Sequence, residues 1–206
     1  INKFLINFNL KYVIDIGSHK GEFIKNIVKY INFQKAYTFE PQKEVFDILK
    51  KNLINDNRIL HNNLGVSDKV GKKKIIINKL TSTSTMSKLD ESSYFLKLKN
   101  FLIKQKKIKE IYDVETTTVD DYFKGLNLQN TLLKIDVEGH ELNVLEGSKN
   151  TIKKIDFVLI ENQYFDIYKD NNINECHSFL KNNQFDLIKK FRFPTLHFED
   201  RLYKKN

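Results

Sequence analysis

The sequence predicts an α/β protein built on a doubly wound, mainly parallel sheet. Short apolar runs alternate along the chain with longer amphipathic segments, the pattern of βαβ units. Glycines and ionisable residues gather directly after two of these runs, where open α/β sheets place their ligands. A length of 206 residues suits one domain with its own hydrophobic core. We therefore expect a single domain over residues 1–206.

The first third of the chain begins this alternation. A short apolar run is closed by Gly17, and Pro41 stops the second such run. The expected elements are the strand Tyr12–Ile16, the helix Gly21–Phe33, the strand Ala36–Phe39 and the helix Val45–Leu53. On the second helix, the residues expected to share one apolar face are Val45, Ile48, Leu49 and Leu53.

The middle of the chain is less regular. Ile59–His61 and Gly65–Val66 are expected to form a third strand and its exit. Lys72–Ile77 is expected at a sheet edge, where lysines discourage further pairing. A Lys-rich stretch with apolar residues near helical spacing then predicts a helical insertion around residues 90–112. It is either a lid over a site or a surface helix packed on the body.

The alternation resumes in the last part of the chain. The expected strands are Val114–Thr118, Leu132–Val137 and Ile155–Glu161, and the expected helices are Val119–Phe123, Glu141–Leu145 and Asn174–Asn182. Gly147 would stop the helix that begins at Glu141. Phe185–Phe191 and Leu196–Tyr203 are expected to close the fold as an antiparallel hairpin.

The chain is strongly basic, with a formal net charge of +9. Its cations are 32 lysines and 3 arginines, whereas recognition of phosphates and bases favours the arginine fork. We therefore expect a solvated lysine surface, and a nucleic-acid partner is unlikely on these grounds. The single cysteine, Cys176, excludes a disulfide framework and a cysteine metal cluster. No metal site is expected, although Asp136, Glu138 and His140 together could bind a metal. Without a membrane-length apolar run or a signal-peptide pattern, we expect a cytoplasmic protein with no transmembrane segment.

The strongest local signal is the turn that follows the first predicted strand. Its residues follow the pattern Asp-x-Gly-x-x-x-Gly, with Asp15, Gly17 and Gly21 at the fixed positions. Dinucleotide binding would require glycine at two further positions, which His19 and Glu22 occupy instead. This mismatch argues against a nicotinamide-dependent oxidoreductase. The spacing suits a ligand that contains adenosine but no phosphate.

Two further groups of polar residues follow buried strands. Glu40 ends the second strand, where a carboxylate can accept the hydroxyl groups of a ribose or merely cap the next helix. Leu132–Val137 runs into a dense group of ionisable residues: Asp136, Glu138, His140 and Glu141. Such a group can hold a cofactor amine, orient a substrate hydroxyl or take its proton, or it can cap the helix that follows.

Taken in order, these segments resemble the FkbM-type family of methyltransferases within the Rossmann-like class. The resemblance covers about positions 12 to 162, because the matching motifs are spread over most of the chain. The stretches that carry it are Ile14–Phe23, Phe39–Pro41, Asn63–Asp68, Thr116–Asp121, Leu133–Glu141 and Val144–Gly147. The resemblance implies a three-layer α/β/α sandwich with a mostly parallel seven-stranded sheet. It also implies S-adenosylmethionine as methyl donor and methylation of an oxygen, often on a sugar or glycan-like acceptor.

The resemblance also implies roles for individual residues. The cofactor would be bound by Asp15, Gly17 and Gly21 at its methionine end, Glu40 followed by Pro41 at the ribose, Asn62 or Asn63 near the adenine, and Asp136 beside the sulfonium. Glu138 and His140 would face the acceptor. His19 departs from the family, whose members usually carry a small residue and Asn after the first glycine, yet it could still line the pocket. The Lys-rich insertion has no counterpart that we can assign in the family, and we expect it to shape the acceptor side.

An alcohol acceptor would benefit from a general base, and the side chains ahead of the predicted helix Glu141–Leu145 supply three candidates. His140 is the first because its ordinary pKa lies near neutrality, followed by Glu138 and Asp136. The rival hypothesis is a basic module that binds RNA or a membrane surface through the Lys-rich stretch, on a fold without catalysis. The acceptor and the oligomeric state are left open.

Overall fold

The fold was analysed in a computed structural model, which describes residues 1–78, 83–85, 109–163, 173–192 and 198–206. Its main feature is a seven-stranded sheet in the order β10-β11-β9-β8-β1-β2-β3. The strands are β1 (Tyr12–Ile16), β2 (Lys35–Phe39), β3 (Ile59–Asn62), β8 (Thr131–Ile135), β9 (Phe157–Gln163), β10 (Phe185–Arg192) and β11 (Phe198–Lys205). The five strands from β9 to β3 are parallel, whereas β11 is antiparallel to both β9 and β10.

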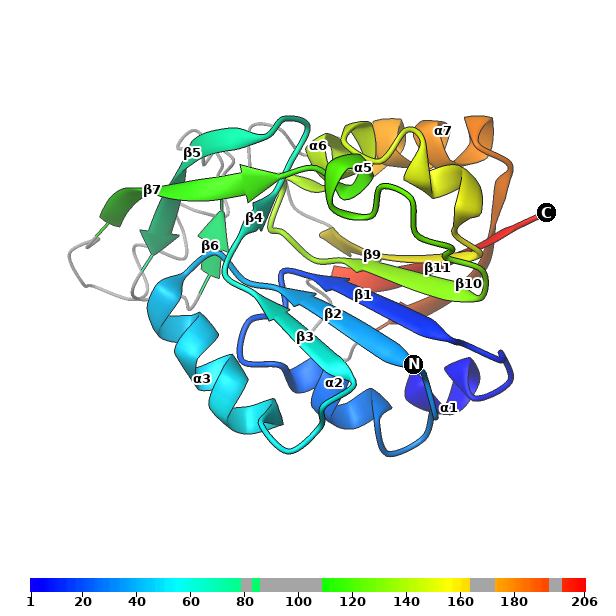
Figure 1. Cartoon of the computed structure of the whole chain (residues 1–206). Coiled ribbons are helices and arrows are strands. Elements are labelled where there is room, and N and C mark those ends of the chain that lie inside the picture. The colour runs from blue at the N-terminus through cyan, green and yellow to red at the C-terminus, as the bar shows by residue number, and fades with distance from the viewer. Residues whose placement is uncertain (79–82, 86–108, 164–172, 193–197) are drawn as a thin grey trace.

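Helices cover both faces of this sheet (Figure 1). They are α1 (Asn2–Leu5), α2 (Glu22–Ile27), α3 (Lys43–Leu53), α5 (Val119–Tyr122), α6 (Glu141–Glu146) and α7 (Ile173–Asn182), with a 3₁₀ turn at Thr151–Lys154. Neighbouring residues on a strand point to opposite faces, so Val13 joins the core under α1–α3 and Ile14 the core under α5–α7. The predicted three-layer α/β/α sandwich and the C-terminal antiparallel hairpin are confirmed.

The strand order reverses at β1, which lies between β2 and β8. One half of the sheet grows from β1 through β2 to β3, and the other half grows from β8 outward. A crevice therefore opens at the carboxyl ends of these central strands, as it does at the switch point of other doubly wound folds. Both polar motifs of the sequence, at Gly17 and at Asp136, follow strands of this central pair.

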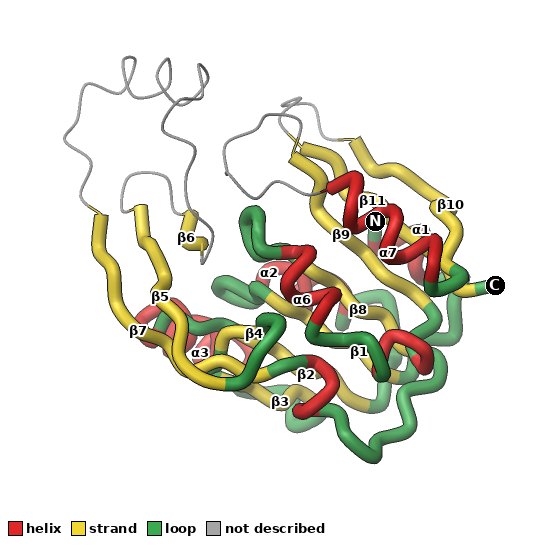
Figure 2. The backbone as a smooth tube through the Cα atoms, turned by 90° about the horizontal axis from the view of Figure 1, so that it is seen from above, coloured by secondary structure: helices red, strands yellow, loops and turns green. Residues whose placement is uncertain are grey.

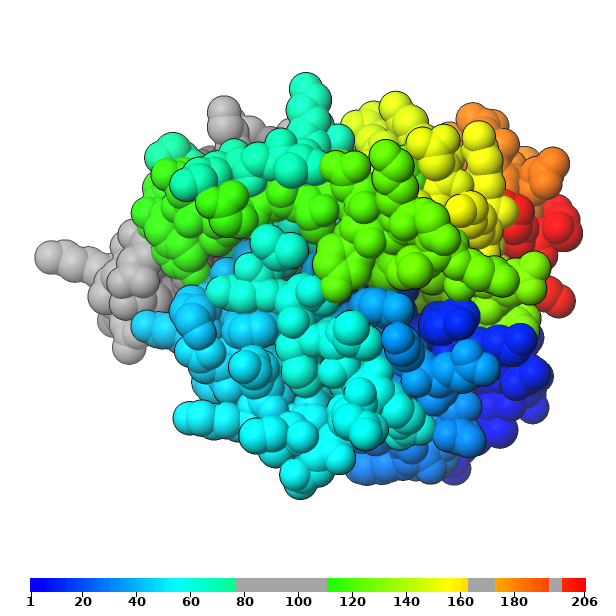
Figure 3. All heavy atoms as spheres, in the orientation of Figure 1, coloured from blue at the N-terminus to red at the C-terminus, as the bar shows by residue number. Residues whose placement is uncertain are grey.

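A second, four-stranded sheet was not predicted. It consists of β4 (Gly65–Val66), β5 (Gly71–Asn78), β6 (Thr83–Thr85) and β7 (Lys109–Thr117), in the order β4-β7-β5-β6. This small sheet lies on the opposite side of the molecule from β10 (Figure 2). In the space-filling view, its residues and those of α3 and β3 meet on one face (Figure 3).

The small sheet corrects three expectations about the middle of the chain. Gly65–Val66 pairs with β7 and does not continue the third strand. Lys72–Ile77 is at an edge only in part, because β5 pairs with β7 along its length but with the described residues of β6 only at Ile76–Asn78. Residues 109–112 are strand and not helix, since β7 pairs antiparallel with β5 from Lys109 onward. The predicted insertion from 90 to 108 lies outside the described residues.

Two helices also differ from the expectation. The first predicted helix ends at Ile27 and not at Phe33, although Ile31 and Phe33 are still buried. On α3, the buried residues are Phe46, Leu49 and Leu53, whereas Val45 is half-buried and Ile48 is exposed. No helix among the described residues is long and apolar enough to cross a bilayer.

Candidate cofactor and acceptor site

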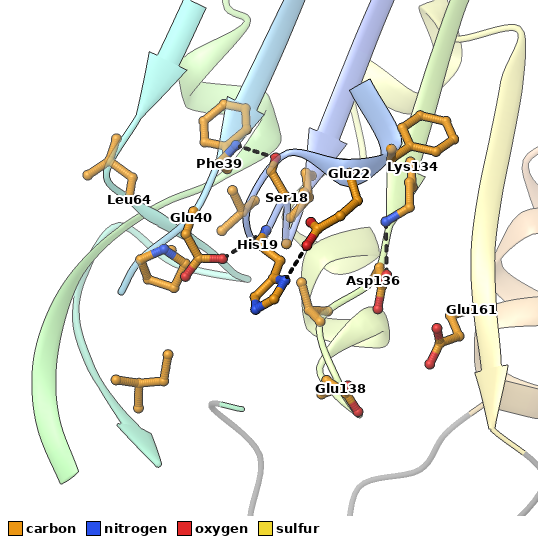
Figure 4. Close-up of a pocket in the computed structure, with 18 residues that line it drawn as sticks. Ser18, His19, Glu22, Phe39, Glu40, Leu64, Lys134, Asp136, Glu138 and Glu161 are labelled. Atoms are coloured by element: carbon orange, nitrogen blue, oxygen red, sulfur yellow. Dashed lines mark hydrogen bonds and ion pairs between the residues drawn. The ribbon is translucent and has the colours of Figure 1, made fainter. Parts of the chain in front are cut away.

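A cavity of about 350 Å³ lies at the carboxyl ends of the central strands, a volume typical of small-molecule sites (Figure 4). One part of its wall comes from the turn after β1, the end of β2 and the loop before β4. The other part comes from the segment after β8 and from β9. Among the residues proposed from sequence, those that line the cavity are Gly17, His19, Glu40, Pro41, Asp136 and Glu138.

The turn after β1 depends on a glycine for a reason that sequence alone does not show. Gly17 has a φ of +79°, and a Cβ atom there would lie 1.8 Å from the carbonyl oxygen of Asp136. The turn is held against β2, because Gly17 and Ser18 both donate their amides to the carbonyl of Phe39. Gly21 serves packing of a different kind, since its Cβ would meet Leu53 of α3 at 2.8 Å.

Glu40 lies at the end of β2 with its carboxylate held by two backbone amides. Its Oε2 accepts from the His19 amide at 3.1 Å, and its Oε1 accepts from the Gln42 amide at 2.9 Å. The residue is 4% exposed, and burial raises the pKa of Glu40 to about 7 despite these bonds. The His19 ring contacts Glu22, with 3.1 Å between its Nδ1 atom and the carboxylate.

The two asparagines proposed for the adenine have other partners. Asn62 accepts a hydrogen bond from the Tyr122 hydroxyl at 2.7 Å and donates to the Thr38 carbonyl. Asn63 donates to the carbonyls of Glu40 and Pro41. Neither asparagine is among the residues that line the cavity. The wall next to them is apolar and is formed by Leu64, Gly65, Val66 and Ile75.

Ile75 could not be found from sequence, because it belongs to β5 of the small sheet. Leu64 and Val66 lie within a stretch that carried the family resemblance, so the signal for them was present but was assigned to the asparagines instead.

A cluster of charged side chains extends from the core to the wall of the cavity, where Lys134 and Asp136 line it. Asp15 is fully buried and does not line the cavity itself. The Lys134 ammonium lies 3.4 Å from Asp15 Oδ1 and 2.9 Å from Asp136 Oδ2. Burial raises the pKa of Asp15, and Lys134 opposes that shift. Burial alone would lower the pKa of Lys134, but Asp136 and Asp15 raise it, so the lysine stays charged.

Three carboxylates converge on the side of the cavity away from Glu40. Asp136, Glu138 and Glu161 each offer an oxygen atom within 4.8 Å of the others. Glu138 has a φ of +54°, a backbone conformation that residues other than glycine rarely adopt. Oxygen atoms at this spacing are compatible with a polar acceptor or with a divalent cation. Glu161 was missed from sequence, although it was expected to end the strand Ile155–Glu161.

His140, the first candidate for the base, does not line the cavity. It is 5% exposed, and its Nε2 lies 2.8 Å from the Ser67 hydroxyl. Burial and the nearby Lys73 lower the pKa of His140 to about 4. The residue precedes α6, where Glu141 accepts from the amides of Val137 and Gly139. The geometry therefore gives His140 a structural position and gives no support to its facing the acceptor.

The wider comparisons agree with this architecture. The Methyltransferase FkbM domain model matches residues 15–187. The crystal structure of Methyltransferase FkbM from Methylobacillus flagellatus KT has a TM-score of 0.62 and 14% identity, over 95% of this chain and 44% of that chain. This chain thus spans less than half the length of that relative. No curated protein matches.

Other similar folds belong to methyltransferases of different kinds. M. capricolum TrmK in complex with S-adenosyl-homocysteine has a TM-score of 0.51 and 15% identity, over 100% of this chain and 67% of that chain. A putative rRNA-methylase from Clostridium thermocellum has a TM-score of 0.56 and 9% identity, over 99% of this chain and 92% of that chain. These likenesses concern the fold. The match of the family model over most of the chain shows that this protein belongs to the FkbM methyltransferase family.

Proposed function

We propose that the chain is a methyltransferase that uses S-adenosylmethionine to methylate a hydroxyl oxygen of a sugar, glycan or related small molecule. The observation that carries this proposal is the division of the cavity. One part holds a glycine turn, a buried carboxylate and an apolar wall, and the other part holds three converging carboxylates. The first part suits an adenosine ligand, and the second suits a polar acceptor.

The residues present fit S-adenosylmethionine in three respects. Glu40 lies where its carboxylate can accept the two ribose hydroxyls, and its own amide partners hold it there. Leu64, Val66 and Ile75 offer an apolar surface for the adenine. Asp136 offers negative charge at the other end, where the positive groups of the cofactor would lie. Asp15 would act from beneath the cavity, through Lys134, and not by direct contact.

The cofactor supplies a methyl group that is already activated by its sulfonium, so the protein chiefly has to hold the acceptor in line. Such positioning contributes about 7–11 kcal/mol to catalysis in favourable cases. Glu138 and Asp136 line the acceptor part and are the proposed candidates for a general base. His140 is a weaker candidate, because its ring contacts Ser67 and its pKa is lowered to about 4.

The charge of the cavity wall bears on the acceptor. Five lining side chains are carboxylates, and the ammonium among them, Lys134, is bound to two aspartates. A phosphate close to the reacting atom would be repelled by this wall. A neutral polyol meets no such cost and can donate hydroxyl hydrogens to the carboxylates. The charges thus favour a saccharide-like acceptor over RNA.

The first experiment is thermal unfolding with S-adenosylhomocysteine, S-adenosylmethionine, NAD⁺ or no ligand. A ligand at a hundredfold excess over its Kd stabilises the native state by about 2.7 kcal/mol. We expect a Tm increase with the two sulfur nucleosides only, and its loss in Glu40→Ala. An unchanged Tm with all ligands would contradict the proposal and return attention to the non-catalytic alternative.

The second experiment identifies the acceptor class. The protein is incubated with S-adenosylmethionine and either a saccharide library or total RNA, and methylated products are detected by mass spectrometry. We expect products in the saccharide arm. Glu138→Gln should lower kcat by about 10²-fold or more if Glu138 is the base, with unchanged binding of S-adenosylhomocysteine. Products in the RNA arm alone would exclude a saccharide acceptor.

A further inference from the structure

Lys134 is a cation built into the cavity wall, and its position is unusual for a lysine. Its side chain is 11% exposed and comes from β8, one strand away from Asp15 on β1. Lysines are rarely buried unless they are paired, because moving a charge out of water costs several kcal/mol. The groups that the Lys134 ammonium contacts therefore indicate its role.

Those partners form a short chain from the core to the cavity. The ammonium lies 3.4 Å from Asp15 Oδ1, 2.9 Å from Asp136 Oδ2 and 5.4 Å from the centre of the Phe23 ring. Further acids face the same region, namely Glu138, Glu161 on β9 and Asp200 on β11. Asp136 therefore lies in a group of like charges that would push its carboxylate away without a cation beside it.

The backbone of Asp136 is fixed independently of this ion pair. Its amide donates to the Ile16 carbonyl at 3.0 Å, and its own carbonyl is in contact with Gly17. The side chain is a different matter, because its carboxylate is partly exposed to the cavity and Lys134 holds one oxygen of it (Figure 4). Among the described side chains, Lys134 is the one that lies within hydrogen-bonding distance of this carboxylate.

We propose that Lys134 is a positioning residue that holds the Asp136 carboxylate toward the positively charged part of the cofactor. This inference rests on the proposed function. It adds that Lys134 helps to determine how tightly S-adenosylmethionine is bound relative to the product S-adenosylhomocysteine. S-adenosylmethionine carries a sulfonium that S-adenosylhomocysteine lacks. A correctly placed Asp136 carboxylate stabilises the former ligand more than the latter.

Positioning by Lys134 and a general charge effect predict opposite changes in relative ligand affinity when Lys134 is removed. Removing a cation close to a cationic ligand, with all else unchanged, would tighten S-adenosylmethionine relative to S-adenosylhomocysteine. Losing the orientation of Asp136 would weaken S-adenosylmethionine relative to S-adenosylhomocysteine. The ratio of the two dissociation constants therefore separates positioning from a general charge effect.

The experiment measures both dissociation constants by calorimetry for the wild-type protein and for Lys134→Met. We expect the variant to lose about tenfold in affinity for S-adenosylmethionine relative to S-adenosylhomocysteine, or about 1.4 kcal/mol. Lys25→Met is the matched control, because Lys25 is exposed on α2 and its loss changes the net charge equally. It should leave the ratio unchanged.

A second pair of variants guards against unfolding caused by an unbalanced Asp15. Asp15→Asn removes that buried charge, so Lys134→Met is also measured in the Asp15→Asn background and compared with Asp15→Asn alone. A tenfold loss of affinity for S-adenosylmethionine relative to S-adenosylhomocysteine in the Asp15→Asn background supports the proposal. An unchanged ratio would mean that Lys134 only balances Asp15, and a tighter S-adenosylmethionine would mean a charge effect; either result overturns the inference. A wild-type protein that binds neither nucleoside would overturn the proposed function together with it.

Discussion

The two sheets of this protein use charged side chains in opposite ways. At the carboxyl ends of the large sheet, the buried Asp15 is joined through Lys134, 11% exposed, to Asp136 in the cavity wall. On the small sheet, consecutive lysines of β5 reach outward to acids, and Lys72 and Lys74 contact Glu115 and Asp113 at 3.2 and 3.7 Å with both partners mostly exposed. The burial of an ion pair therefore decides how much it contributes to stability or to the site.

The same comparison bears on the basic composition of the chain. In β5, the three consecutive lysines each contact a carboxylate, including the pair between Lys73 and Asp68. These three lysines of the small sheet thus have carboxylate partners within the protein. Ser67 connects the small sheet with the segment after β8: its hydroxyl donates to Asp68 and also contacts His140.

The largest expected effect lies at the turn of the large sheet. Gly17→Ala should destabilise the protein by about 4 kcal/mol or more, because its Cβ would overlap the Asp136 carbonyl. Gly125→Ala is the matched control, since Gly125 has nearly the same φ of +80° but nothing within 4 Å of its Cβ. It should cost about 1 kcal/mol from backbone strain alone. Equal losses in urea unfolding would show that strain and not contact decides the role of Gly17.

A smaller effect is expected where the two regions meet. Ser67→Ala removes a fully buried hydroxyl that bonds Asp68 and contacts His140, and should cost about 1–3 kcal/mol. Ser178→Ala removes an exposed hydroxyl that bonds a helix carbonyl and should cost less than about 0.5 kcal/mol. Chemical denaturation compares the two variants. A Ser67 cost as small as that of Ser178 would mean that the sheets are held together without this contact.

The pH dependence of ligand binding tests the cavity itself. Ribose hydroxyls would donate to ionised Glu40, whose pKa is raised to about 7 by burial. Affinity for S-adenosylhomocysteine should therefore increase about tenfold from pH 6 to pH 8, as the ionised fraction rises. Glu40→Gln should flatten this profile, whereas Glu44→Gln, at an exposed position on α3, should leave it intact. A profile that survives Glu40→Gln would assign the titration to another group.

Without ligand, the same group acts on stability in the opposite sense. The folded state raises the pKa of Glu40 above its ordinary value, so its contribution is fully present below pH 4.5. That contribution is lost as the pH rises through about 7. Urea unfolding of the ligand-free protein should therefore show a decline across this window that is smaller in Glu40→Gln.

The smallest effect belongs to the exposed pairs of the small sheet. Lys72→Ala and Lys74→Ala should each change the unfolding free energy by less than about 1 kcal/mol, and added salt should shrink the change further. Urea unfolding at low and high salt measures this. A loss as large as that of Ser67→Ala would show that these pairs act as a network and not as isolated contacts.

The sequence alone was sufficient for the large sheet and for much of the cavity. Short apolar runs between amphipathic segments predicted its strands and the C-terminal hairpin. Strands that are buried on both faces of a sheet consist mostly of apolar residues, so they are easy to recognise in the sequence. The residues after those runs, such as Gly17, Glu40 and Asp136, line the cavity because parallel strands bring their carboxyl ends to one edge. The family resemblance rested on the same stretches and is confirmed.

Tertiary structure decided the rest. The small sheet depends on pairing between β5 and β7, which are more than 30 residues apart, and no local pattern specifies such a partner. His140, the first candidate base from sequence, is buried against Ser67 and does not line the cavity. Glu161, to which sequence gave no role, lies beside Asp136 in the cavity because β9 is next to β8 in the sheet. Sequence specifies which residues are apolar or charged and in what period; which charges become buried together follows from pairing between distant segments.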